Sequence, residues 1–442
     1  MNEPHGRHRR AETGVGAEDV LATSSPAEHT GPRHSAAPRV RRSPWDRRRD
    51  RVLAALLVVA WVAAGVLVWT FSDSRATTQE TAAPPPALPP APESVPDDLA
   101  EVWRAPSDAT PVPVAEDSAV VAASDGEVTG RDPLTGEVRW RYARDLQLCT
   151  VAGAWSKAVA VYRKDTGCSE VTQLDPATGH RTAQRNGDAE LGTRLVVGEG
   201  HVTATGERLL NTWRDDLVKS MEYGRVPAKV NPDRQPRTGC VYDSVAAGAG
   251  KVGVVESCPR ETGDRLTVLK AAGENADEPE SEFSTVLPER GAQLVAMSGD
   301  FTAVALPERD RLVVYDAEGI QHAAYPLEVP DSDLTANPPG RVAPTAKGIE
   351  NVYWFTGSST VALSRADLAP RWTLEGTLGP GTVFGKQIVV PVESGLAVLD
   401  ELTGDTAGTV AVDRRGYAGP VRLNAIGPVL LEQRGGTLVA LR

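Results

Sequence analysis

From about residue 98 to the end of the chain, apolar residues come in short blocks separated by Gly, Asp and Asn. Blocks of this kind, bounded by turn-forming residues, are typical of β-strands. The region lacks the apolar periodicity of an amphipathic helix of ten residues or more. We therefore predict an all-β domain over residues 98–442, and because the blocks recur in a similar order we expect a repeat.

The clearest repeat unit runs from residue 119 to Trp140. Residues 119–123 predict a buried strand, and Asp125-Gly126 predicts a hairpin turn of the kind that needs positive φ. A second strand follows. Residues 132–136 (Asp-Pro-Leu-Thr-Gly) then predict a tight turn, because Pro presets φ and Gly accepts the left-handed conformation. The last strand of the unit ends in Trp140.

This unit recurs along the domain, which is the pattern of a β-propeller. The turn reappears at 175–179, 43 residues later, and more loosely at 316–319, 366–372 and 400–404, with degenerate units around 209–213 and 266–270. The third strand of each four-stranded unit is predicted near 127–132, 169–175, 208–213, 265–270, 311–316, 360–366, 395–400 and 437–442. Eight blades give a period of about 43 residues, which is usual for propellers. Seven blades follow if one degenerate unit is an insertion.

The two ends of the domain complement each other. Residues 436–442 have the pattern of a third strand without a fourth, and residues 101–104 that of a fourth strand without the first three. Joined, they complete one blade, which is how propellers close their ring and remove exposed sheet edges.

A different pattern precedes the domain. From Val52 to Phe71 the chain has twenty residues without a charge, about 30 Å of helix, which matches the hydrocarbon core of a bilayer. A secretory signal peptide has a shorter apolar region and a small-residue cleavage site, and residues 71–75 are a poor one. Because no Cys lies near its end, we do not expect a cleaved lipoprotein. The sequence predicts an uncleaved transmembrane helix at 52–71.

Charge predicts the orientation of this helix and the place of the other segments. Positively charged flanks stay in the cytoplasm, and seven arginines precede the helix closely: Arg39, Arg41, Arg42, Arg47, Arg48, Arg49 and Arg51. We expect residues 1–51 to be a disordered, basic cytoplasmic tail at the plasma membrane, because they lack apolar periodicity. Residues 72–97 are rich in Pro and predict a stiff linker that lifts an extracytoplasmic domain off the bilayer.

The net charge limits the classes of partner that the chain is expected to bind. The chain carries −12, but residues 1–51 hold eleven Arg against seven Asp or Glu, a net of +4, so the remainder carries −16. An acidic exported domain repels phosphate and argues against nucleic acid as a partner.

The Asp-Pro-Leu/Ala-Thr-Gly turn followed by Trp resembles the repeat of the pyrroloquinoline-quinone-like (quinoprotein-like) β-propellers. This family includes the quinoprotein alcohol dehydrogenases and non-enzymatic relatives, among them an outer-membrane assembly lipoprotein. The resemblance covers most of 98–442 and is carried by units one, two, six and seven. It implies an eight-bladed fold. Because the adjacent cysteines that lie over the cofactor in the dehydrogenases have no counterpart here, we expect a membrane-anchored, non-enzymatic member without a bound cofactor.

Four cysteines lie in the exported part, and an even number outside the cytoplasm predicts disulfides. Three pairings are open. Separations of 19 and 18 residues fall within single blades and favour one bond within each blade, each worth about 3 kcal/mol in the chain-entropy model. Zinc would need tighter spacing and neighbouring His. The favoured pairs are Cys149–Cys168 and Cys240–Cys258.

Other candidates for chemistry have structural interpretations. Residues 248–253 match a dinucleotide-binding spacing, but that motif acts between a strand and a helix, and here we predict a hairpin turn. The acidic segment 274–282 lacks the alternation of a calcium loop, so we expect a solvated loop. The histidines lie far apart and are expected on the surface or in turns, and three tryptophans are expected to pack between blades: His180, His201, His322, Trp140, Trp213 and Trp372.

These patterns favour a binding scaffold in the cell envelope, with an envelope protein or cell-wall component as its partner. A sensor that signals through a partner protein is the first alternative. A quinoprotein-type oxidoreductase or another propeller enzyme is the second, and it would need a ligand set that the sequence does not display. We predict no catalytic residues, no metal site and no cofactor.

Overall fold

The computed structural model describes residues 47–70, 72, 75–227, 231–334 and 338–442. The chain has two compact units, Met1–Leu67 and Val68–Arg442. Most of helix α1 (Arg48–Thr70) belongs to the first unit, and its 23 residues are long and apolar enough to cross a membrane. The predicted span at 52–71 is therefore helical over its described part. The expected disordered tail at 1–51 lies, up to residue 46, outside the described residues.

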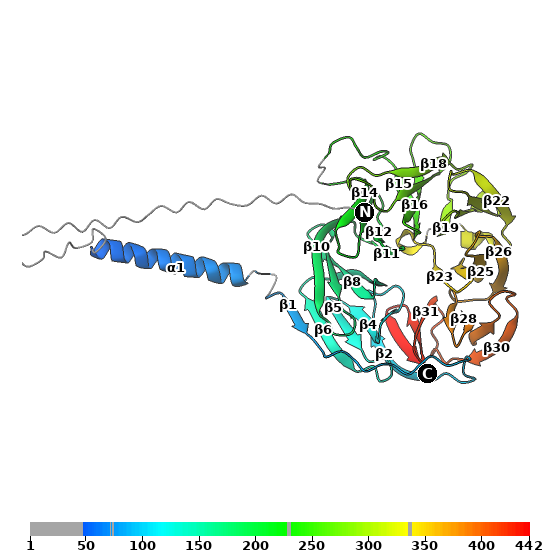
Figure 1. Cartoon of the computed structure of the whole chain (residues 1–442), viewed down its shortest axis with the longest axis horizontal. Helices are drawn as coiled ribbons and strands as arrows, with labels where there is room; N and C mark the ends of the chain where they lie inside the picture. Colours follow the sequence, from blue (N-terminus) through cyan, green and yellow to red (C-terminus); the bar gives the residue numbers. More distant parts are fainter. Residues whose placement is uncertain (1–46, 71, 73–74, 228–230, 335–337) are drawn as a thin grey trace, which may run out of the picture. The chain divides into compact units, whose positions relative to one another are not determined.

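The second unit is a ring of eight β-sheets, a β-propeller (Figure 1). Each sheet has four antiparallel strands, and the first gains a fifth. The prediction of eight blades is confirmed, and the alternative of seven is wrong because both degenerate units form complete sheets. All eight predicted third strands are present, at β5, β9, β13, β17, β21, β25, β29 and β33.

Blades 1 to 4 follow in chain order, and each blade is given from its innermost to its outermost strand. They are β3 (Val114–Glu116), β4 (Ala119–Ser124), β5 (Glu127–Arg131) and β6 (Val138–Arg144); β7 (Leu148–Ala154), β8 (Lys157–Lys164), β9 (Gly167–Leu174) and β10 (Arg181–Ala189); β11 (Leu195–Val197), β12 (Val202–Ala204), β13 (Leu209–Trp213) and β14 (Lys219–Gly224); and β15 (Val241–Gly248), β16 (Lys251–Ser257), β17 (Arg265–Lys270) and β18 (Ser281–Val286).

Blades 5 to 8 continue the series, and the last blade ends on a strand from the start of the domain. They are β19 (Gln293–Met297), β20 (Thr302–Leu306), β21 (Arg311–Tyr315) and β22 (Gln321–Pro326); β23 (Thr345–Lys347), β24 (Asn351–Phe355), β25 (Ser359–Ser364) and β26 (Pro370–Glu375); β27 (Thr382–Phe384), β28 (Gln387–Val392), β29 (Gly395–Leu399) and β30 (Thr406–Ala411); and β31 (Val421–Ile426), β32 (Val429–Arg434), β33 (Thr437–Leu441) and β2 (Glu101–Pro106). Short helices η1 (Pro307–Arg309), α2 (Asp331–Leu334) and η2 (Pro339–Arg341) lie in connections.

Burial within a blade explains the apolar blocks of the sequence. Second and third strands such as β20 and β29 are buried at every residue, because a neighbouring blade covers each of their faces. Strands buried on both sides have continuous apolar runs. The outermost strand β26 alternates between half-buried and exposed residues, because one of its sides meets solvent.

The ring closes as predicted. Strand β2, from the start of the domain, pairs with β33 at the end of the chain, from Glu101 opposite Leu441 to Pro106 opposite Thr437. The first and last segments of the domain lie side by side at the bottom of Figure 1. This pairing leaves no open edge between the first and last blades.

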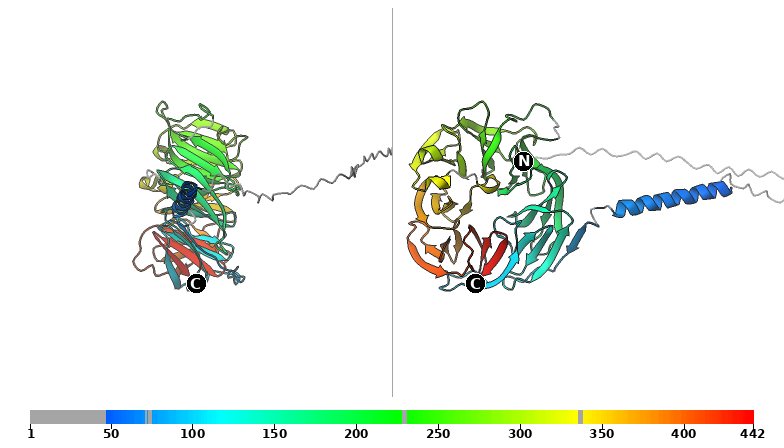
Figure 2. Two further views of the ribbon diagram at one scale, coloured as in Figure 1. Left: turned by 90° about the vertical axis from the view of Figure 1, so that its left-hand side faces the viewer. Right: turned by 180° about the vertical axis from the view of Figure 1, so that it is seen from behind.

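Seen on edge in the left view of Figure 2, the ring has two faces. We call one the connection face: it carries the connections from each outermost strand to the next innermost strand, among them residues 107–113, 225–227, 231–240, 327–334, 338–344 and 412–420. The opposite turn face carries the turns between first and second strands and between third and fourth strands, such as 175–180 and 384–387. Since every blade repeats the same order, all innermost strands run from the connection face to the turn face.

Adjacent blades are fastened by an aromatic side chain over a glycine. Trp140, on β6, is buried, donates from Nε1 to the carbonyl oxygen of Pro176 at 2.7 Å, and covers Gly179 in the turn of the next blade. The carboxylate of Asp175 holds this turn by accepting from the backbone N–H of residues 177 and 178 at 3.0 Å each.

The same contact recurs around the ring. It joins Trp103 to Gly136, Trp372 to Gly404 and Phe283 to Gly319. A Cβ on any of these glycines would come within 2.8 Å of the ring, and each glycine has φ near +75°. Trp213 also packs between blades, but it lies on a third strand and contacts Gly187. The packing role predicted for the three tryptophans agrees with these contacts.

The Pro-rich linker does not stand free of the ring. Strand β1 (Thr77–Glu80) pairs with β6 as the fifth strand of blade 1. Beyond it, Leu88 and Val95 pack against apolar clusters of the propeller, and the backbone N–H of Val95 donates to Gln387 Oε1 at 3.1 Å. The expectation of a spacer that lifts the domain is therefore wrong for residues 77–97, because β1 pairs along the outer edge of blade 1 and apolar residues among the prolines dock the following part on the turn face.

We expect Gly179→Ala to lower the free energy of unfolding by about 2–4 kcal/mol. Of this, about 1 kcal/mol reflects an L-residue forced to positive φ and about 1–3 kcal/mol the collision of the new methyl with Trp140. Urea unfolding of the detergent-solubilised protein, followed by tryptophan fluorescence, measures the change.

Gly192→Ala is the matched control, because Gly192 also has positive φ (+80°) but has open space around its Cβ position. It should cost only the backbone part, about 1 kcal/mol. Equal losses in both variants would show that the contact with Trp140 does not fasten the blades.

Candidate functional site

The four cysteines form the two favoured disulfides. Cys149 on β7 bonds to Cys168 on β9, and Cys240, before β15, bonds to Cys258, after β16. None of the four cysteines, all of which the structure describes, has a free thiol. Both bonds tie strands or connections within one blade, which is a structural role.

Cys240, Cys258 and Glu256 lie close enough together to be considered as metal ligands. However, the two sulfurs are bonded to each other, so the group offers a single carboxylate and no thiolate. The partners of this carboxylate decide what the group does.

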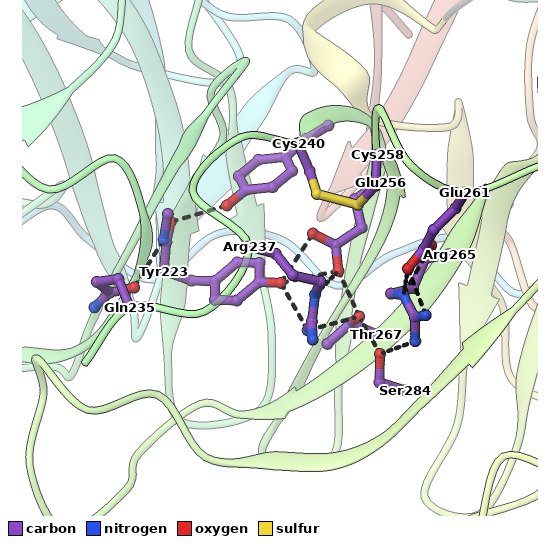
Figure 3. Close-up of polar contacts among 12 residues, drawn as sticks. Tyr223, Gln235, Arg237, Cys240, Glu256, Cys258, Glu261, Arg265, Thr267 and Ser284 are labelled. Atoms are coloured by element: carbon purple, nitrogen blue, oxygen red, sulfur yellow. Dashed lines mark hydrogen bonds and ion pairs between the residues drawn. A yellow bond between two sulfur atoms is a disulfide. The ribbon is translucent and has the colours of Figure 1, made fainter. Parts of the chain in front are cut away.

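Glu256 is fully buried and its hydrogen-bonding capacity is used within the protein (Figure 3). It accepts from Tyr223 Oη at 2.9 Å, Arg237 Nε at 2.9 Å and Thr267 Oγ1 at 2.6 Å. Arg237 Nη2 also donates to Tyr223 Oη at 3.0 Å. Burial, together with the charge of Glu256, raises the pKa of Tyr223, so the phenol stays protonated and donates. A buried charge with this many partners stabilises structure.

This network fixes the connection between β14 and β15. Tyr223 belongs to blade 3, Glu256 to blade 4, and Arg237 to the connection between them. Two residues earlier, Gln235 donates to the carbonyl oxygens of Glu222 and Asp277 at 3.1 and 3.0 Å. The described part of this long connection is therefore held against the blades.

The same device occurs at two other blade junctions. An arginine at the end of an outermost strand or in the following connection pairs with a fully buried glutamate of the next blade: Arg144 with Glu170, and Arg414 with Glu432. In the second pair Nη2 and Oε1 are 2.8 Å apart. Three arginine–glutamate pairs thus join consecutive blades, each through a fully buried carboxylate, and Glu432 also pairs with Arg434 of its own blade at 2.7 Å.

A cavity with a volume of about 690 Å³ lies at the centre of the ring. Residues of the innermost strands of seven blades line it, and connections such as 107–113 and 339–344 bound it on the connection face. Its wall is largely apolar, with residues such as Val151, Val196 and Val295. Cavities of this size and character hold small molecules.

Charged residues occupy opposite ends of this cavity. Arg194 immediately precedes β11 and Arg422 is the second residue of β31, so both lie toward the connection face. Glu116 and Lys347 end β3 and β23 and lie toward the turn face. The two arginines are thus separated from Glu116 by the length of the innermost strands, and Asp108 is the acidic lining residue on their side of the cavity.

Burial, and after it the positive charge of Arg194, lowers the pKa of Arg422 to about 10. Burial also lowers the pKa of Arg194. Both guanidinium groups remain protonated at neutral pH. At the far end, burial and then the charge of Asp117 raise the pKa of Glu116.

Other residues singled out in the sequence lie apart from this cavity. Residues 248–253 form the predicted turn and the start of a strand, with β15 ending at Gly248 and β16 beginning at Lys251. His180 and His322 are exposed, as expected. His201 is in a turn but is buried, and burial lowers its pKa. Sequence reasoning missed Arg194 and Arg422, since neither belongs to a motif.

Comparisons with known proteins identify the fold and no family. No protein-family profile matches the chain, and no curated protein matches its sequence. Among solved structures, the computationally designed Ika8 protein is 15% identical over 78% of this chain and 99% of its own, with a TM-score of 0.53. At this identity the similarity shows a shared propeller fold.

Two natural proteins align less well. BamB from Moraxella catarrhalis is 15% identical over 78% of this chain and 99% of its own, with a TM-score of 0.47. The quinohemoprotein alcohol dehydrogenase from Comamonas testosteroni is 12% identical over 78% of this chain and 76% of its own, also with a TM-score of 0.47. Function has to be argued from this chain's own residues.

We expect Arg237→Leu to destabilise the protein by about 3 kcal/mol, because it leaves the carboxylate of Glu256 buried without a cation. Urea unfolding measures the loss, and adding Glu256→Gln to the variant should restore part of the stability. Arg234→Leu is the control: it lies in the same connection, but its pair with Glu278 is exposed and 3.6 Å long, so its loss should be within about 0.5 kcal/mol. Equal effects would contradict a structural role for the buried pair.

Proposed function

We propose that this protein is a single-pass, membrane-anchored β-propeller of the cell envelope that acts by binding a protein or ligand on the connection face of its extracytoplasmic ring. The cytoplasmic N-terminus and the anchor are inferred from the arginines before α1. The two disulfides support an oxidising compartment for the ring.

The observation that carries the proposal is the central cavity and its position. It is bounded on the connection face by several inter-blade connections, including part of the segment 327–344. The turn face is partly covered by the docked segment 82–97, which contacts turns of blades 2, 7 and 8. A partner therefore has more freely accessible surface on the connection face, and loops on a rigid scaffold commonly carry binding function.

The blade contacts support membership in the quinoprotein-like repeat group. The Asp-Pro-x-Thr-Gly turn presents its glycine to the tryptophan of the preceding blade, as with Gly179 and Trp140, so the motif has a packing function that needs no cofactor. The chain lacks the adjacent cysteines of the dehydrogenases. We therefore favour the non-enzymatic branch of that group.

Photo-crosslinking in intact cells tests the binding face. A photoreactive residue at the exposed positions Arg234 or Glu328, in two long connections, should capture one reproducible envelope protein or cell-wall component. The same residue at exposed Asp300, in the β19–β20 turn on the turn face, is the matched control. Capture from Asp300 alone would show that the binding surface is on the turn face and would contradict the proposed connection face. Capture from none of the positions would contradict a scaffold role.

Topology is a separate prediction. Alkaline phosphatase fused to the C-terminus should be active, because it folds only where disulfides form, whereas the same enzyme fused to the N-terminus should be inactive. The reverse activities would overturn the proposed orientation.

A further inference from the structure

The arginines at three blade junctions are paired with buried glutamates, and the arginines of the central cavity depart from that pattern. Arg144, Arg237 and Arg414 each meet a fully buried glutamate. Arg194 and Arg422 line the cavity toward the connection face, and neither guanidinium forms an ion pair within the described part of the chain.

Arg422 presents an unused donor. Its Nη1 is fully buried and has no hydrogen-bond partner among the described residues. Of the two segments inside the ring domain that the structure does not describe, 228–230 and 335–337, neither contains an acidic residue. The charge that most affects Arg422 is that of Arg194. Both guanidinium groups line the same cavity, and two like charges in a partly desolvated site are costly unless an anion joins them.

Acidic groups of the cavity are poorly placed to neutralise this pair. Glu116 lies at the other end of the innermost strands, near the turn face. Asp108 is on the connection face, but it is exposed and forms no ion pair with either arginine in the described structure. The end of the cavity near the connection face therefore carries two positive charges against the one exposed carboxylate of Asp108.

The backbone holds Arg194 in place. Its N–H donates to Thr205 Oγ1 at 2.9 Å, and the N–H of Thr205 donates back to the carbonyl oxygen of Arg194 at 2.9 Å. Thr205 Oγ1 also donates to the carbonyl oxygen of Gly340 at 2.8 Å. A Cβ at Gly340 would lie 1.9 Å from Cγ of Arg194. Gly340 thus leaves room for the side chain of Arg194.

We propose that Arg194 and Arg422 form a binding site for an anionic group, a carboxylate or a phosphate, carried by a small molecule or a chain end that enters the central cavity. The planar guanidinium is suited to both groups because its N–H donors match their oxygen atoms in pairs. This inference rests on the proposed binding function and specifies the chemistry of one ligand.

Thermal unfolding and titration calorimetry of the full, detergent-solubilised chain test the site with two probes, inorganic phosphate and succinate, each compared with sodium chloride at equal ionic strength. At least one probe should raise the unfolding midpoint in a saturable way. The probe that binds more tightly identifies the preferred anionic group.

Variants distinguish a specific site from general charge effects. Arg194→Gln and Arg422→Gln should each weaken binding of the effective probe at least tenfold. Gly340→Ala should also weaken it, although it keeps both charges. Arg371→Gln is the matched control, because Arg371 is exposed on the outermost strand of blade 6, and it should bind like the unmodified protein.

Stability without the probe gives an independent readout. Because Arg422 has an unpaired buried donor, Arg422→Gln should leave the unfolding midpoint unchanged or raise it, whereas Arg237→Leu lowers it. A midpoint loss in Arg422→Gln as large as in Arg237→Leu would show that Arg422 is a structural residue. Failure of both probes to exceed chloride, or equal weakening by Arg371→Gln, would also overturn the site.

The proposed function can fail separately. If the unmodified protein binds neither probe but still captures a partner from the connection face, the anion site is contradicted and the scaffold role stands. Saturable anion binding without any captured partner would contradict the protein scaffold and leave the anion site standing.

Discussion

The contact of an aromatic ring with a glycine of the next blade is the constraint on which the ring depends. A four-stranded blade cannot bury both of its faces alone, so its second and third strands need neighbours on either side. Trp140 sets one such neighbour distance, because its ring lies where a side chain at Gly179 would otherwise be. Phe283 does the same over Gly319. The contact therefore requires glycine for two reasons, the space and the positive φ of the turn.

Once the blades are spaced in this way, the remaining features follow from ring geometry. The eight innermost strands meet around a centre that their side chains do not fill, which leaves the cavity. Closure by β2 and β33 joins the two ends of the domain. Buried arginine–glutamate pairs then tie consecutive blades near the connection face. Such pairs give fixed geometry more than net stability, since desolvation offsets much of their attraction.

Local sequence signals predicted the fold, but they did not predict which distant segments and side chains come together. Turns such as 132–136 are recognisable in the sequence because Pro and Gly have characteristic φ values. The spacing of the cysteines favoured the two disulfides that the structure contains. The docking of Leu88 and Val95 was missed because proline-rich sequence is compatible with both a free spacer and a docked segment. Nothing local links Arg194 to Arg422, which lie in different blades and come to line one cavity only through the curvature of the ring.

Arg194 and Arg422 are informative because arginines at three blade junctions of the same chain are paired with buried glutamates. A sequence that pairs an arginine with a buried glutamate at three blade junctions has the means to do so in the cavity as well, by placing one acidic residue on a neighbouring innermost strand. Departures from an otherwise consistent pattern are expected at functional sites, where local stability is given up for another purpose. Arg422 and Arg194 are such a departure, and they lie where all blades converge and a small ligand could be enclosed. The electrostatic cost of leaving them unneutralised is what would make binding of an anion favourable.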